Sequence, residues 1–158
     1  QLILIKQFIK FIKMKLEDFL GQGFKLLCKM YPSDKYKQGI DIDFTKEIDD
    51  TSVPGVYILT NSKEEILKIG QSSHIGNRFN RMYKCISNTT NNKVRSYIRD
   101  CDIIWVYTLP MAKLKHIVNI KGKDVKLETS FASSLEKHLL KEYRETNNSL
   151  PVLNSGLS

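Results

Sequence analysis

The sequence has few cysteines, and they show no metal-binding or disulfide pattern. The 158 residues include three, Cys28, Cys85 and Cys101. An odd number without a C-x-x-C pair argues against a disulfide framework and against a zinc site, so we interpret them as reduced, intracellular thiols. Cys85 and Cys101 fall near the apolar side of predicted helices, which favours a packing role for both.

Acidic side chains are also in short supply. Asp and Glu number 17 against 25 Lys and Arg, which gives a formal net charge of +8. This excess favours an anionic partner, with nucleic acid first and an anionic membrane second. Composition leaves a third possibility open, a basic protein whose lysines only keep it solvated. The length fits one domain, and no internal repeat is visible.

The sequence has no apolar run long enough to cross a bilayer, because lysines interrupt the most apolar segment, residues 1–20. At helical spacing this segment forms an amphipathic stripe. A basic amphipathic helix can lie on a membrane, serve as a targeting peptide or pack on the domain. We favour packing on the domain, or an upstream extension over residues 1–13, above a membrane role. The stripe consists of Ile5, Phe8, Ile9, Ile12, Leu16, Phe19 and Leu20.

Beyond Gly21 and Gly23, turn signals and periodicity divide the chain. A second short helix is expected over 24–30, followed by loop as far as Pro54-Gly55. β-branched and aromatic content predicts a β-hairpin of strands 56–60 and 66–70. The remaining expected elements are a helix from Ser73, a short helix near 94–101, a strand over 102–110, a hairpin over 115–128 turning at Gly122-Lys123, and a helix over 130–144 capped by Thr129 or Ser130.

The helix that begins near Ser73 has two distinct faces. Its apolar stripe consists of Ile75, Phe79, Met82 and Ile86, spaced 4, 3 and 4 apart. About a quarter to a third of a turn away lies a polar, partly basic face that carries His74, Arg78 and Arg81.

One carboxylate occupies an unexpected position on the last helix. Phe131, Leu139 and Tyr143 are among the residues of its apolar arc, and Glu136 falls inside that arc, at about 140° from Phe131. Desolvating an unpaired carboxylate is costly, so Glu136 should have a cation, a metal or hydrogen-bond donors beside it. A structural salt bridge is the simpler explanation, and it is the better one for Glu142 at the margin of the arc.

Taken in order, these residues resemble the GIY-YIG nuclease superfamily. Gly55-Val56-Tyr57 lies on the first strand and Lys68-Ile69-Gly70 on the second, 11 residues from Tyr57 to Lys68. Arg78 follows 10 residues later, then Glu136 on a late helix and Asn154 in a closing loop. The resemblance covers residues 54–158. It implies an α/β (α+β) fold with a small, mainly antiparallel three-stranded central sheet flanked by helices.

The resemblance also implies a metal-dependent DNA endonuclease of restriction-like or mobile-element type. Glu136 would bind one Mg²⁺ or Mn²⁺, and Arg78 would pair with a non-bridging phosphate oxygen. Tyr57, beside Lys68, would orient or deprotonate the attacking water. His74 is a possible proton shuttle or a solvated surface histidine, and Asn154 would brace the site or be an ordinary turn residue. DNA-backbone contacts would come from Arg81 and Lys84.

Two departures from the family pattern keep an alternative open. Val56 replaces Ile, which is harmless, whereas Lys68 replaces a tyrosine and removes a phenol. The alternative is therefore a module that binds nucleic acid without cutting it. We expect an N-terminal helical extension and loop (1–53), a nuclease-like domain (54–158) and an insertion at 111–128. The extension and the insertion would contact DNA in the cytoplasm or nucleus, with no membrane partner beyond the weak possibility for residues 1–20.

Overall fold

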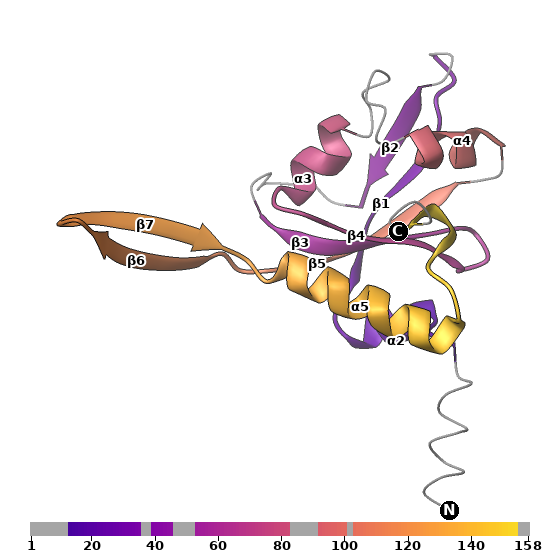
Figure 1. Ribbon diagram of the computed structural model, residues 1–158. Helices are drawn as coiled ribbons and strands as arrows, with labels where there is room; N and C mark the ends of the chain where they lie inside the picture. Colours follow the sequence, from indigo (N-terminus) through magenta and orange to yellow (C-terminus); the bar gives the residue numbers. More distant parts are fainter. Residues whose placement is uncertain (1–12, 36–38, 46–52, 83–91, 101–102, 155–158) are drawn as a thin grey trace, which may run out of the picture.

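The computed structural model describes residues 13–35, 39–45, 53–82, 92–100 and 103–154 (Figure 1). Several residues of interest lie outside this description: the segment 1–12, Lys84, Cys85, Ile86 and Cys101, together with the side chains of Arg81 and Met82. The third cysteine, Cys28, is described and fully buried, and burial followed by the charge of Asp43 raises the pKa of its thiol to about 12. Cys28 is therefore a packing residue and not a reactive thiol.

A five-stranded antiparallel sheet forms the centre of the fold. Its strand order is β2-β1-β5-β3-β4, so β2 and β4 are the two edges. β3 is buried along its whole length because helices cover both of its faces. The bounds are β1 Lys25–Pro32, β2 Ile40–Phe44, β3 Gly55–Thr60, β4 Ile66–Ser72 and β5 Ile104–Pro110.

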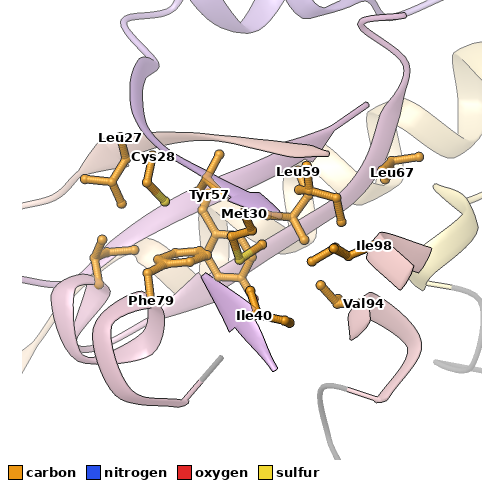
Figure 2. Packing of buried hydrophobic residues seen from close by; sticks show 13 residues of the cluster. Leu27, Cys28, Met30, Ile40, Tyr57, Leu59, Leu67, Phe79, Val94 and Ile98 are labelled. Carbon is orange, nitrogen blue, oxygen red and sulfur yellow. The ribbon is translucent and has the colours of Figure 1, made fainter. Parts of the chain in front are cut away.

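Two apolar clusters fill the two sides of this sheet. One joins Tyr57 and Leu59 of β3 to Phe79 and Val94 on the neighbouring helices, as Figure 2 shows. The other joins Val56 and Ile58 to the long C-terminal helix. The helices are α2 (Leu16–Gly21), α3 (Ile75–Asn77), the π-helix η1 (Arg78–Met82), α4 (Asn92–Asp100), α5 (Ala132–Asn147) and the 3-10 helix η3 (Val152–Asn154).

The antiparallel α+β architecture flanked by helices is confirmed, but the sheet has five strands where we expected three. The expected helix over 24–30 is wrong, because this segment is β1 and pairs with β5. The expected loop conceals β2, in which Ile40, Ile42 and Phe44 alternate with aspartates. That alternation has the period of a strand, and pairing with β1 outweighs the weak strand propensity of Asp.

The other elements fall close to their expected places. The β3–β4 hairpin, α4 and β5 are confirmed. The last helix begins later than expected, at Ala132, and its N-cap is Phe131 without a side-chain cap, so the expected caps Thr129 and Ser130 are wrong. Phe131 is 59 % exposed and not part of the core arc.

The N-terminal segment packs on the domain where it is described. Leu16 and Phe19 of α2 are buried in the cluster beneath α5, which confirms the packing expectation for these two residues, whereas Leu20 is 44 % exposed. Within the described part of the chain, no helix has the length and apolarity needed to cross a membrane.

A second sheet consists of one hairpin, β6 (Leu114–Ile120) and β7 (Lys123–Thr129). It extends away from the body of the protein on the side where α5 begins (Figure 1). Its turn is Lys121-Gly122, one residue before the expected position, and both residues have positive φ, 52° and 79°. This is the backbone geometry that matches the twist of a two-residue hairpin.

Candidate active site

The candidate site lies along the free edge of the sheet, at β4. Ile69 and Gln71 of β4 direct their backbone N–H groups away from β3, because these groups donate to side chains of later segments, Asn154 and Glu136. An unpaired strand edge exposes N–H and C=O groups that must find other partners. Two later segments of the chain, η3 and α5, supply them.

Tyr57 packs directly on Gly70, which explains the glycine. A Cβ added at Gly70 would lie 2.5 Å from the phenol oxygen of Tyr57 and 2.8 Å from its Cε2, so no other residue fits without movement. The Tyr57 ring also meets Phe79 edge to face, with centroids 5.0 Å apart. The phenol is only 2 % exposed. The Tyr57 ring is therefore held between Gly70 of β4 and Phe79 of η1, and Figure 2 shows its neighbour Phe79.

Asn154 bridges the backbone of Ile69 with both ends of its amide. Its Oδ1 accepts the Ile69 N–H at 2.8 Å, and its Nδ2 donates to the Ile69 carbonyl at 2.9 Å. The side chain is 4 % exposed, so both bonds are shielded from water. Asn154 thereby acts as a short extra strand beside Ile69 and holds the backbone between Lys68 and Gly70.

His74 and Arg78 lie on either side of α3: His74 is its N-cap residue, and Arg78 is the first residue of η1, which follows α3 directly. The Arg78 N–H donates to the His74 carbonyl at 3.0 Å, so the two residues are one helical turn apart. Arg78 is half-buried, and its Nε is buried without a hydrogen-bond partner among the described residues. His74 is exposed. A π-helix begins at Arg78, and such irregular turns are frequent at functional sites.

Glu136 of α5 approaches the same edge from the other side. Burial raises the pKa of its carboxyl, and four groups oppose this effect: the charge of Lys68, a hydrogen bond from the Gln71 backbone N–H, and the charges of Lys137 and Arg78. Lys68 is half-buried on β4. The carboxylate thus experiences the positive field of both predicted cations. Glu136, Lys68 and Arg78 are electrostatic neighbours, as their order in the sequence could not show.

A structural salt bridge explains one of the two glutamates considered on α5, Glu142, but not the other, Glu136. Glu142 pairs with His138, Oε2 to Nε2 at 3.5 Å, once the histidine is protonated, as expected for a structural pair. Within the described residues, no Lys, Arg or His nitrogen lies within 4.0 Å of the Glu136 carboxylate. Glu136 is therefore a partly desolvated anion near cations but not neutralised by direct contact.

Sequence reasoning missed Gln71 as a member of this site. Its contribution comes from the backbone N–H, so its side-chain type carries no signal. The available clue was topological, because a strand at the edge of a sheet has outward-facing N–H groups. Phe79 was expected only as a core residue, and it also fixes the Tyr57 ring.

The residues present fit a metal ion held mainly by water and substrate, and not one enclosed by protein ligands. The described residues contain no group of three or more His, Cys, Asp or Glu side chains near one another. Glu136 is the carboxylate that accepts a hydrogen bond from the β4 backbone, at Gln71. Mg²⁺ commonly binds through one or two carboxylates while keeping several waters and substrate oxygens, so one half-buried, unneutralised carboxylate is a sufficient protein ligand.

Comparison with solved structures shows which fold this is. The chain is similar to restriction endonuclease HPY188I in complex with product DNA, with 20 % identity over 89 % of this chain and 85 % of that one, and a TM-score of 0.51. It is also similar to a mutant of bacteriophage T4 EndoII, with 14 % identity over 83 % of this chain and 96 % of that one, and a TM-score of 0.60. No protein-family profile and no curated protein sequence matches. The fold is therefore shared with these two proteins.

Proposed function

We propose that this protein is a metal-dependent DNA endonuclease of the GIY-YIG type that hydrolyses phosphodiester bonds. The main support is the environment of Glu136. Its carboxylate is half-buried, has no direct ion pair among the described residues, and lies in the electrostatic field of Lys68 and Arg78. Support comes from the net charge of +8 and from the fold shared with a restriction endonuclease bound to product DNA.

Each residue of the site has a role in this proposal. Arg78 pairs with a non-bridging phosphate oxygen, for which a planar guanidinium is well suited. Lys68 stabilises the negative charge that develops on the phosphate. Tyr57, which is nearly closed to bulk solvent, orients or deprotonates the attacking water. His74 exchanges protons with solvent from its exposed position, and Asn154 positions β4.

Glu136 would hold Mg²⁺ or Mn²⁺. When bound, the ion supplies Lewis-acid stabilisation of the phosphate and of the leaving 3′ oxygen. The raised pKa of Glu136 fits this role, because a carboxylate that is costly to ionise gains most from a cation beside it. Direct pairing with lysine would compete with the metal, and no such contact within 4.0 Å is present in the described structure.

A plasmid-nicking assay tests the proposal. Supercoiled DNA is incubated with the protein in Mg²⁺, in Mn²⁺ and in EDTA, and the relaxed and linear forms are quantified. We expect cleavage with either metal and none in EDTA. Glu136→Gln should lower the rate by about a hundredfold to a thousandfold, as loss of one charge-stabilising group does. Glu142→Gln, on the same helix, should cleave like the wild type.

DNA-binding measurements distinguish variants that lose the cleavage step from variants that lose DNA binding. Arg78→Ala should abolish cleavage and also weaken DNA binding, because it removes a phosphate contact. Glu136→Gln should bind DNA as well as the wild type or better, since it removes a negative charge. Tight binding by a wild-type protein that cuts in none of the metals would instead establish the non-cleaving module and contradict the proposal.

A further inference from the structure

The β6–β7 hairpin has no role in the site described above, yet it is the most exposed element of the fold. Every residue of β7 is exposed, and Val118 is the only half-buried residue of β6. An isolated two-stranded hairpin is marginally stable in water. The hairpin also projects from the body of the protein, so both of its faces are accessible to a partner (Figure 1).

The charge of the hairpin is strongly positive. Asp124 and Glu128 are its only acids, so residues 113–129 carry a net +3 of the +8 of the whole chain. β6 carries one lysine, whose Nζ lies 3.9 Å from Oε1 of Glu128, β7 carries two, and one lysine lies just before β6 and one in the turn; all five are exposed. The lysines are Lys113, Lys115, Lys121, Lys123 and Lys126.

The dimensions of the hairpin match duplex DNA. A two-stranded ribbon fits the major groove, which is about 12 Å wide and has a phosphate backbone along each wall. Strands of seven residues are about 24 Å long, enough to follow several base pairs of the groove. The register places Lys115 and Lys126 on one face of the ribbon and Lys123 on the other, so lysines from both strands are available to the phosphate walls, and this charge complementarity favours a polyanion over a neutral partner.

The hairpin is also tightly connected to the candidate site. Only Ser130 and Phe131 separate the last residue of β7 from the first residue of α5, the helix that carries Glu136. A ribbon seated in a groove would therefore fix the distance between the DNA backbone and that carboxylate. We propose that the β6–β7 hairpin is a duplex-DNA-binding ribbon whose lysines supply a large part of the affinity, an inference that rests on the proposed function for its substrate.

The hairpin has a second surface that points to a competing partner. The strand register places Val118, Ile120, Val125 and Leu127 on one face, and three of these side chains, Ile120, Val125 and Leu127, are exposed. Exposed apolar faces often mark protein contacts. We favour DNA over a second copy of the chain as the partner, because two ribbons of charge +3 would repel each other. Self-association through this face is an outcome that the experiment must distinguish.

The test measures binding without cleavage. Fluorescence anisotropy of a labelled duplex is recorded in EDTA at several salt concentrations, for the full-length chain. Changing Lys115, Lys123 and Lys126 together to Ala should lower the slope of log K against log salt by about 0.9 per lost phosphate contact, about 2.7 in all, and weaken binding by at least about tenfold near 0.1 M salt. The matched control changes the exposed body lysines Lys25, Lys63 and Lys141 to Ala and should have a smaller effect.

Two results would overturn the proposal. One is a ribbon variant whose slope and affinity equal those of the wild type or of the control variant. The other is a change in solution mass: if the wild type is a dimer by light scattering and Val118→Asp is a monomer with unchanged DNA binding, the ribbon binds a second copy. The anisotropy assay contains no metal, so it measures DNA binding independently of cleavage. A wild-type protein that binds DNA through the ribbon in this assay, but does not cleave DNA in the nicking assay with metal, would refute the proposed function and leave the ribbon proposal intact.

Discussion

Glu136 lies at the edge of β4, where ionising its carboxyl costs free energy because the group is partly buried. This cost can be measured. Burial raises the pKa of this carboxyl against the opposing charges of Lys68 and Arg78. The folded protein therefore holds the Glu136 proton to higher pH than the unfolded chain does. Its contribution to stability is largest below the usual glutamate pKa and declines as the pH rises through the raised value.

This linkage predicts that Glu136→Gln stabilises the protein at neutral pH. The amide has no charge to desolvate, so the variant should have a higher melting temperature than the wild type at pH 7, and the difference should disappear at a pH below the usual glutamate pKa. Thermal unfolding between pH 3.5 and 7.5 measures it. An equal gain in Glu142→Gln, or a gain that grows at acidic pH, would contradict this assignment.

A glycine is needed at position 70 because the Tyr57 side chain packs against it, and not because the backbone there has a positive φ. A methyl group at this position would overlap the Tyr57 phenol, which Phe79 holds from the other side. Gly70→Ala should therefore destabilise the fold by about 1–3 kcal/mol, the usual cost of overpacking. In urea unfolding, Tyr57→Leu should remove most of that penalty in the double variant. Additive effects of the two substitutions would show that Tyr57 is not the obstacle.

At the scale of elements, β4 is an edge strand completed by side chains from elsewhere. Asn154 of η3 satisfies Ile69, and Gln71 faces the carboxylate of α5. This arrangement covers an edge that would otherwise be open to pairing with another chain. It also makes the geometry of the site depend on a residue more than 80 positions away in the sequence.

The edge arrangement predicts the effect of Asn154→Ala. Two buried backbone groups of Ile69 would lose their partners, which costs about 1–3 kcal/mol for each unsatisfied group before relaxation. Hydrogen exchange should show the Ile69 amide losing protection far more than the Ile58 amide of β3. Asn80→Ala, at an exposed position, is the control. Unchanged protection at Ile69 would mean that Asn154 does not hold the strand.

Local pattern predicts some of these elements and misses others for identifiable reasons. The β3–β4 hairpin follows from β-branched residues around the Asn61 turn, whose Oδ1 accepts the N–H groups of Lys63 and Glu65. β1 was mistaken for a helix because its apolar residues do not alternate cleanly, and a bulge between Leu26 and Cys28 shifts its register. Only pairing with β5, some 80 residues later, makes it a strand.

The candidate site shows the same division. Tyr57, Lys68, Arg78, Glu136 and Asn154 could be selected from order and residue type, and the charge effects on Glu136 place Lys68 and Arg78 near it. The hydrogen bonds of Asn154, the packing of Tyr57 on Gly70 and the role of the Gln71 backbone required the sheet order. Contacts made by the backbone, or set by which strand is outermost, have no signature in a single sequence.

At the scale of the whole molecule, the sheet brings one anion and several cations to a single edge, and the stability of the entire fold should respond to a divalent ion. A ligand that binds only the folded state stabilises it by about 1.4 kcal/mol at ten times its dissociation constant. For a chain of this size that corresponds to about 3–6 °C in melting temperature. Mg²⁺ should therefore raise the melting temperature of the wild type and of Glu142→Gln.

Glu136→Gln should respond to Mg²⁺ no more than to the same ionic strength of NaCl, because the charge that attracts the ion is gone. The comparison with NaCl is essential in a protein of net charge +8, since salt alone screens repulsion among its lysines. A titration followed by differential scanning calorimetry separates the two effects. If Mg²⁺ stabilises Glu136→Gln as strongly as the wild type, the ion binds elsewhere, and the edge of β4 is not a metal site.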